Sequence, residues 1–247
     1  MNDVIALLNA HRSVRKYKAS DVPDEHVCAA VAAGQAASTS SAIQAYCVIQ
    51  VTAPESRREL AKLTGPQKHV GDAGAFFVIC GDSRRHRLAC ADHGRKYDAR
   101  FEAFLLASID ASLFAQNMVI AFESLGYGVC YIGGLRTRIN EIDRLLQIPE
   151  GVYPLFGLCV GVPDERPEPR PRLPIEAVLF KDRYPSDEAM QDLMVEYDEA
   201  YRSYLRQRSA GKESIARAWA SRMGEKFSEP RRPHVGAYYT RKGADLS

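Results

Sequence analysis

The chain has 247 residues, of which 46% are hydrophobic, so it can form one large domain or two small ones with an ample core. Its 33 Lys and Arg residues nearly balance 31 Asp and Glu, and the net charge of +2 is too small to indicate a nucleic-acid partner. The six cysteines lack the close spacing of metal knuckles, which favours the reduced thiols of a cytoplasmic protein over a disulfide framework.

The chain begins with a short predicted helix followed by a basic cluster. Val4, Ile5 and Leu8 share one helical face, and residues 1–10 lack the long apolar region of a secretory signal. The cluster, residues 11–15, combines a histidine, two arginines and a serine. Because guanidinium groups match phosphate oxygens with paired donors, this cluster is a candidate phosphate site, and a solvated basic turn is the alternative.

A second helix is predicted to begin after Pro23, with Asp24 as its N-cap. It ends in a run of hydroxyl residues, which disfavour helix and offer a dense set of hydrogen-bond donors. The run is expected either to contact a phosphate or ribose chain or to form a flexible loop. Its members are Ser38, Thr39, Ser40 and Ser41.

Two strands are predicted next, over residues 46–52 and 75–80, because both are rich in β-branched and aromatic residues. A short helix over residues 57–63 lies between them. The turn that follows this helix carries an amide and an imidazole, Gln67 and His69.

The segment from residue 81 to residue 100 is polar and basic. His86, Cys90 and His93 fall at helical spacing within it, which is also a pattern for metal ligands. Asp92 is the only acidic residue that suggests a supporting shell, so we expect a mobile surface lid and no metal site.

A long helix is predicted over residues 104–125, with apolar residues on nearly every side, so we expect it to be buried all round. Asp110, Gln116, Asn117 and Glu123 interrupt it too often for a membrane span.

Glycines follow this helix. Gly126 is placed to end it as a left-handed cap, and a short strand over residues 129–132 leads to Gly133 and Gly134. A glycine pair at a strand end lets the backbone approach a flat ligand closely, and a plain turn is the alternative.

The C-terminal part begins with a helix over residues 142–146, capped by Thr137, and a strand over residues 154–160. Prolines then hold the chain extended, so that Arg170 and Arg172 point the same way. The remainder is helical and charged and contains an amphipathic helix over residues 215–223. Its basic tail is interpreted as solvated surface, and binding of an anionic partner is the alternative.

Helices and short strands interleave without strict alternation, which predicts an α+β fold rather than a doubly wound sheet. The candidate groups form one picture if they bind a single phosphorylated planar ligand. In this picture the basic cluster holds the phosphate, the glycine pair approaches the ring, and Arg15 or Arg170 lies near an anionic edge.

The chain resembles the oxygen-insensitive NADPH nitroreductases of the major, A type, and the related NADPH-flavin oxidoreductases. The resemblance covers nearly the whole chain in order. The segments that carry it are His11-Arg12-Ser13-Val14-Arg15, Ser40-Ser41, Gly65-Pro66-Gln67-Lys68-His69-Val70, Glu123-Ser124-Leu125-Gly126, Tyr131-Ile132-Gly133-Gly134-Leu135, Leu155-Phe156-Gly157-Leu158-Cys159 and Arg172-Leu173-Pro174.

The resemblance implies one nitroreductase domain over residues 1–247, a mainly antiparallel sheet flanked by helices, and a homodimer with FMN at the subunit interface. The long helix would lie in the dimer core, and a C-terminal extension over residues 185–247 would embrace the partner chain. The residues implied to bind FMN are His11, Arg12, Ser13 and Arg15 with Ser38, Thr39, Ser40 and Ser41 at the phosphate and ribityl chain, Gln67 and His69 at the pyrimidine edge, Tyr131, Ile132, Gly133 and Gly134 along the ring, and Arg170 and Arg172. The family has lysine where this chain has Arg170, which keeps the charge and changes its reach.

The resemblance further implies that NADPH reduces the flavin and that nitroaromatics, quinones or similar electron-poor acceptors then reoxidise it in a ping-pong cycle. No protein nucleophile, acid or base is required. Arg208, or alternatively Arg206, would bind the 2′-phosphate of NADPH. The alternatives are an NADPH-flavin oxidoreductase that supplies reduced FMN to a partner, and a non-catalytic flavin- or nucleic-acid-binding protein.

Overall fold

The computed structural model describes residues 2–208 and 218–247. The chain divides into two compact units: Met1–Pro167 together with Arg232–Ser247, and Glu168–Arg231. The first unit thus contains both ends of the chain.

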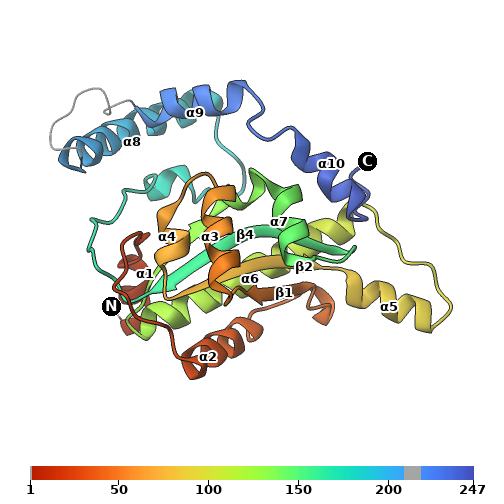
Figure 1. Ribbon diagram of the computed structural model, residues 1–247. Helices are drawn as coiled ribbons and strands as arrows, with labels where there is room; N and C mark the ends of the chain where they lie inside the picture. Colours follow the sequence, from red (N-terminus) through yellow and green to blue (C-terminus); the bar gives the residue numbers. More distant parts are fainter. Residues whose placement is uncertain (1, 209–217) are drawn as a thin grey trace. The chain divides into compact units, whose positions relative to one another are not determined.

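An antiparallel four-stranded sheet forms the centre of the first unit (Figure 1). In spatial order its strands are β1 (Tyr46–Gln50), β2 (Ala75–Asp82), β4 (Val152–Gly161) and β3 (Gly128–Ile132). Every residue of β2 is buried, as its continuous apolar sequence predicts for a strand covered on both faces. The sheet confirms the predicted α+β class.

Helices cover both faces of this sheet (Figure 1). Phe77 and Ile79 of β2 pack with one set of helices, and their neighbours Phe76 and Val78 pack with the other, because successive side chains of a strand point to opposite faces. The first set contains α2 (Asp24–Gln35) and α6 (Phe101–Ser124), with α1 (Asp3–Asn9) against α6 and α10 (His234–Arg241) adding to the core. The second contains α3 (Pro54–Leu63), α4 (Lys68–Asp72) and α7 (Ile139–Leu146).

The long helix α6 is apolar on two sides. Its sheet-facing side is buried, and Phe114 and Met118 pack so closely on α2 that a Cβ at Gly34 would lie 2.7 Å from the Phe114 ring. On the opposite side Leu105, Ile109 and Leu113 are 38%, 46% and 44% exposed. By length and composition α6 could cross a membrane, but it is the core helix of a globular fold, with a carboxylate at mid-length. We expected α6 to be buried on all sides, but within a single chain only its sheet-facing side is buried.

The predicted helix ends are right at Gly126 and wrong at two other places. Gly126 has φ +85°, and the N–H of Tyr127 donates to the Phe122 carbonyl, which is a left-handed C-cap. The N-cap of α2 is Pro23 instead of Asp24, with no side-chain cap bond. The N-cap of α7 is Arg138 instead of the predicted Thr137. The ring of Pro23 fixes its φ and leads the chain into α2 without a side-chain cap. Asp24 therefore falls in the first turn, where its negative charge interacts favourably with the helix dipole.

The lid segment contains a helix, α5 (Arg84–Asp92), followed by chain without regular secondary structure. The described residues contain no group of three or more side chains suited to a metal ion.

The second unit contains α8 (Asp187–Arg208), α9 (Trp219–Ser228) and a short turn η3 (Ile175–Ala177). Its core is aromatic: Tyr197 and Tyr201 are buried and Trp219 packs edge-on against Tyr197 at 5.5 Å. The predicted helix over 215–223 begins at Trp219, and residues 215–217 lie outside the described part of the chain.

Candidate functional site

The basic cluster runs along the outer edge of β3. Ser13 forms a parallel bridge with Val129, and the Val14 N–H donates to the Val129 carbonyl at 2.9 Å. His11 Nδ1 lies 2.7 Å from Glu123 Oε1 at the end of α6, which leaves Nε2 as the ring nitrogen that can face a ligand. The backbone of the basic cluster is thus attached to β3 at Ser13 and Val14.

Arg12 and Arg15 are oriented by the chain around them. Arg12 donates through Nε to the Ala10 carbonyl at 3.0 Å and through Nη1 to the Pro167 carbonyl at 3.3 Å. The carboxylate of Glu165 accepts the N–H groups of Arg15 and Lys16 at 2.6 and 3.2 Å, so it fixes the backbone while the Arg15 guanidinium stays exposed. A cavity of about 610 Å³ opens beside Arg12 and Glu165.

Gln67 and Gly134 meet, although they are far apart in sequence. Gln67 Nε2 donates to the Thr64 carbonyl at 2.6 Å. A Cβ on Gly134, in the turn η2 (Gly133–Arg136), would lie 2.1 Å from that carbonyl and 2.3 Å from Gln67 Nε2. Only glycine fits here, because the Thr64 carbonyl and the Gln67 amide occupy the place that a Cβ would take. The approach of the glycine pair to a flat ligand stays a prediction.

One ring nitrogen of His69 lies in the interior of the first unit. Its Nε2 is buried and has no hydrogen-bond partner among the described residues. Burial, and then the charge of Arg15, lower the pKa of the imidazole, so it is neutral at physiological pH. A buried polar atom of this kind requires a partner, and a bound polar ring edge would supply one.

Tyr131 and Ile132 differ in what they offer a ligand. The ring of Tyr131 lies edge-on to Phe156 at 5.3 Å, and its hydroxyl donates to Gln116 Oε1 at 3.4 Å. The side chain of Ile132 is packed in the core with Leu135, so only its backbone can reach a ligand.

The hydroxyl run lies elsewhere in the first unit. Ser40 begins the short turn η1 (Ser40–Ala42), and its N–H donates to Asp110 at the middle of α6, whereas His11 bonds Glu123 at the end of α6. At about 1.5 Å per residue, these two points on α6 are about 20 Å apart. One chain therefore does not bring the hydroxyl run to the basic cluster.

The remaining predicted residues belong to the second unit. Arg170 and Arg172 are exposed, Arg172 Nη1 donates to the Arg170 carbonyl at 3.0 Å, and Tyr197 Oη donates to the Pro171 carbonyl at 3.0 Å. Arg206 is exposed on α8. The side chain of Arg208 lies outside the described residues.

Sequence reasoning missed three carboxylates: Asp110, Glu123 and Glu165. Asp110 and Glu123 were visible as charges inside an apolar helix, and a buried carboxylate signals a partner because an unpaired one is costly. Glu165 stands in a proline-rich stretch where nothing in the sequence marks it.

Comparison with known proteins identifies the family. The nitroreductase family model matches residues 8–162, and the model of the C-terminal domain of that family matches residues 170–247. The chain is 40% identical to a Cr(VI) reductase of Pseudomonas sp. (strain G-1), over 96% of this chain and 97% of that protein. It is 38% identical to an FMN reductase (NADPH) of Bacillus subtilis and 37% identical to an oxygen-insensitive NADPH nitroreductase of Salmonella typhimurium, each over 98% of both chains.

Solved structures agree with these relatives. NfrA1 of Bacillus megaterium has a TM-score of 0.95 at 39% identity, covering 99% of this chain and 100% of that one. The NADPH:FMN oxidoreductase of Vibrio harveyi, solved with NAD⁺, has a TM-score of 0.88 at 36% identity, covering 98% and 99%. The chain therefore belongs to the nitroreductase family and is an NADPH-dependent flavin oxidoreductase with the nitroreductase fold.

Proposed function

We propose that this enzyme holds FMN as a bound cofactor and uses NADPH for the two-electron reduction of nitroaromatics, quinones or similar electron-poor acceptors by a ping-pong mechanism. The observation that carries the proposal is the group formed by Gln67, His69 and Gly134. Gly134 packs tightly on Thr64 beside Gln67, the buried His69 Nε2 has no hydrogen-bond partner among the described residues, and Arg15 acts electrostatically on that imidazole. A bound flat ring with a polar edge would supply the partner that His69 Nε2 requires.

The side chains of the first unit would bind and orient this cofactor. His11 Nε2, Arg12 and Ser13 would hold the phosphate and ribityl chain, and the exposed guanidinium of Arg15 would face the pyrimidine edge. When bound, FMN supplies hydride transfer at its N5 atom. A fixed cation beside the ring would stabilise the negative charge that it acquires on reduction, as preorganised donors do in sites shielded from water.

A homodimer is part of the proposal. The exposed stripe of Leu105, Ile109 and Leu113 recurs every four residues, which suits packing against a second copy of α6. The separation of about 20 Å between the hydroxyl run and the basic cluster leads to the same arrangement, because the hydroxyls of one chain would complete the FMN site of the other.

NADPH preference would come from Arg208, or from Arg206 as the alternative, at the 2′-phosphate. If neither Arg208→Ala nor Arg206→Ala weakens NADPH binding, the arginines of α5 are the next candidates, and two of these form ion pairs within the first unit. Arg85 pairs with Asp82 at 3.1 Å, and Arg87 pairs with Glu150 at 2.8 Å.

The test is purification with bound flavin, followed by anaerobic stopped-flow mixing with NADPH and then with a panel of acceptors. We expect one FMN per chain, bleaching by NADPH, and reoxidation by nitroaromatics and quinones. Arg15→Ala should lose FMN, since a charge-assisted hydrogen bond contributes about 1.5–3 kcal/mol. Arg58→Ala, which removes an exposed arginine from α3, is the matched control. Full flavin occupancy in Arg15→Ala would refute the proposed site.

A second candidate function is favoured by the FMN reductase and NADPH-flavin oxidoreductase relatives. The enzyme would then deliver reduced FMN to another protein. Stoichiometric consumption of free FMN with NADPH would support this function, and turnover of bound FMN alone would support acceptor reduction.

A further inference from the structure

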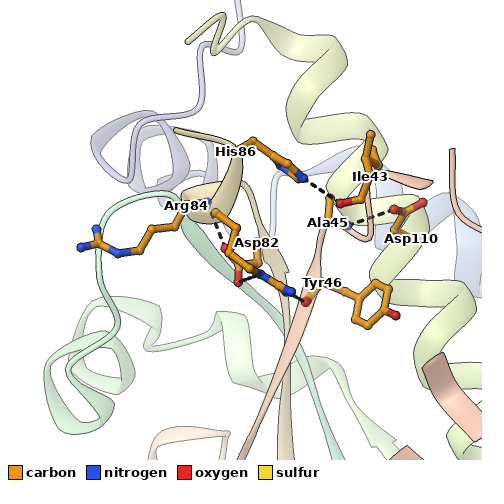
Figure 2. A network of polar contacts seen from close by, with 8 residues as sticks. Ile43, Ala45, Tyr46, Asp82, Arg84, His86 and Asp110 are labelled. Atoms are coloured by element: carbon orange, nitrogen blue, oxygen red, sulfur yellow. Dashed lines mark hydrogen bonds and ion pairs between the residues drawn. The ribbon is translucent and has the colours of Figure 1, made fainter. Parts of the chain in front are cut away.

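Asp110 is a buried carboxylate in the middle of an otherwise apolar helix. It is 1% exposed, and both of its oxygens accept backbone hydrogen bonds. One comes from the N–H of Ser40 at 3.3 Å and the other from the N–H of Ala45 at 3.0 Å, the second of which Figure 2 shows. A carboxylate is retained in such a place only when its hydrogen bonds offset the loss of water. These two bonds tie both ends of one loop, residues 40–45, to α6.

The loop between these ends has a conformation that its residues do not favour. Ser41, Ala42 and Gln44 have φ of +46°, +57° and +49°, in the left-handed region that costs side-chain-bearing residues free energy. Such backbone persists only where surrounding contacts impose it. The bonds of Ser40 and Ala45 to Asp110 are two such contacts, and the loop between them would leave this conformation if they were lost.

A second contact holds the loop from the side of α5. His86 Nε2 lies 2.7 Å from the carbonyl of Ile43 (Figure 2). Arg85, which pairs with Asp82, donates to the carbonyl of Tyr46 at the start of β1. The loop is thus bonded to Asp110 through the N–H groups of its two ends and to α5 through the carbonyl of Ile43. The side chains of Ser40 and Ser41 are exposed.

We propose that Asp110 is a positioning residue: it fixes the 40–45 loop so that the hydroxyls of Ser40 and Ser41 bind FMN. The inference rests on the proposed function, and by the separation along α6 the flavin concerned is that of the partner protomer. Asp110 touches neither cofactor nor substrate and acts only through the loop.

The central experiment replaces Asp110 by asparagine. The amide keeps one acceptor but places an N–H₂ donor against the second backbone N–H, so one end of the loop is released while side-chain size is unchanged. We expect FMN binding, measured by flavin fluorescence quenching in the apo-protein, to weaken about tenfold, which corresponds to about 1.4 kcal/mol. Asn117→Ala is the matched control, because it removes a hydrogen bond from the same helix to the Ala33 carbonyl, at 3.3 Å, and should leave FMN affinity unchanged.

A double-mutant cycle separates positioning from general support of the fold. In a Ser40→Ala/Ser41→Ala background the hydroxyls are absent, so Asp110→Asn should cause no further loss of FMN affinity. If the losses are additive, or if Asp110→Asn binds FMN as tightly as the wild type, the inference is overturned.

Substitutions at Ala42 test the loop without touching Asp110, in case the Asp110 variant does not fold. Ala42 is exposed, so Ala42→Val should fold, but a β-branched residue opposes φ +57° and should weaken FMN binding. Ala42→Gly removes the left-handed cost and should restore part of the affinity lost in Asp110→Asn. Unchanged FMN affinity in Ala42→Val would overturn the inference. A wild type that binds no FMN would instead refute the proposed function.

Discussion

The imidazole of His69 connects the candidate site to pH. Its pKa is lowered below the ordinary value of about 6.5, first by burial and then by Arg15. As pH falls below about 6.5 the unfolded chain binds a proton that the folded chain resists, so the free energy of unfolding decreases. The contribution of neutral His69 to stability is therefore fully present above that pH and is lost progressively in acid.

We predict that the apo-protein loses thermal stability below about pH 6.5 more steeply than His69→Asn does. The measurement is the Tm of both proteins between about pH 5 and pH 8. His93→Asn, at an exposed histidine at the end of α5, should follow the wild-type curve. Parallel curves for the wild type and His69→Asn would show that the imidazole is protonated equally in both states.

Gly134 allows a second prediction at the scale of one residue. Because a Cβ there would overlap the Thr64 carbonyl, Gly134→Ala should destabilise the protein by about 1–3 kcal/mol and reduce FMN occupancy. At Gly236, in α10, no described atom lies within 4 Å of the added Cβ, and Gly236→Ala should stabilise by about 0.4–1 kcal/mol. Chemical denaturation of the two variants measures both signs, and equal effects would contradict the close approach.

Among the elements, α4 depends on one side chain of its neighbour. Arg57 of α3 donates to the carbonyls of Val70 and Gly71, both at 3.3 Å, and to that of Ala73. These groups end the short helix that follows Gln67 and contains His69, so Arg57 fixes the position of both site residues.

Arg57→Met is expected to lower the free energy of unfolding by about 1.5–3 kcal/mol, as for a partly buried charged donor. Arg58→Met, which removes only an exposed ion pair with Glu55, should cost at most about 1 kcal/mol. Urea unfolding distinguishes them. If the two variants unfold alike, the guanidinium of Arg57 does not hold the end of α4.

The elements were predictable from the sequence where local pattern decides them. The apolar run of β2 and the length of α6 show directly in the residues, and Gly126 ends α6 as its type suggests. The contacts of the site were less predictable because they join distant positions: the Asp110 partners lie 70 and 65 residues away, and the Glu165 partner at Arg15 lies 150 away. Local propensity contains no information about such pairs.

For the whole molecule, the proposed dimer gives a prediction of complementation. An Arg15→Ala chain lacks the ring cation, and a Ser40→Ala/Ser41→Ala chain lacks the hydroxyls. In a mixed dimer, if each site takes its cation from one chain and its hydroxyls from the other, both defects fall in one site and the second site is intact. We expect about one FMN per two chains and about half of wild-type activity in co-expressed, doubly tagged dimers.

The two parent homodimers are the controls, and both should bind FMN weakly. If the mixed dimer is as weak as its parents, each site is built from one chain and the assignment of the hydroxyls to the partner is wrong.

The C-terminal residues have a consequence for synthesis of the protein. Tyr238, Tyr239 and Ala244 lie in the same core as α6, Tyr239 donates to the Pro154 carbonyl at 2.8 Å, and the Gly151 N–H donates to the Lys242 carbonyl at 2.8 Å. The ribosome adds these residues well after β4 and α6. The sheet and α6 therefore wait, with part of their apolar surface uncovered, until the segment that carries Tyr238, Tyr239 and Ala244 has been made, and during that interval the nascent chain is open to chaperones and to aggregation.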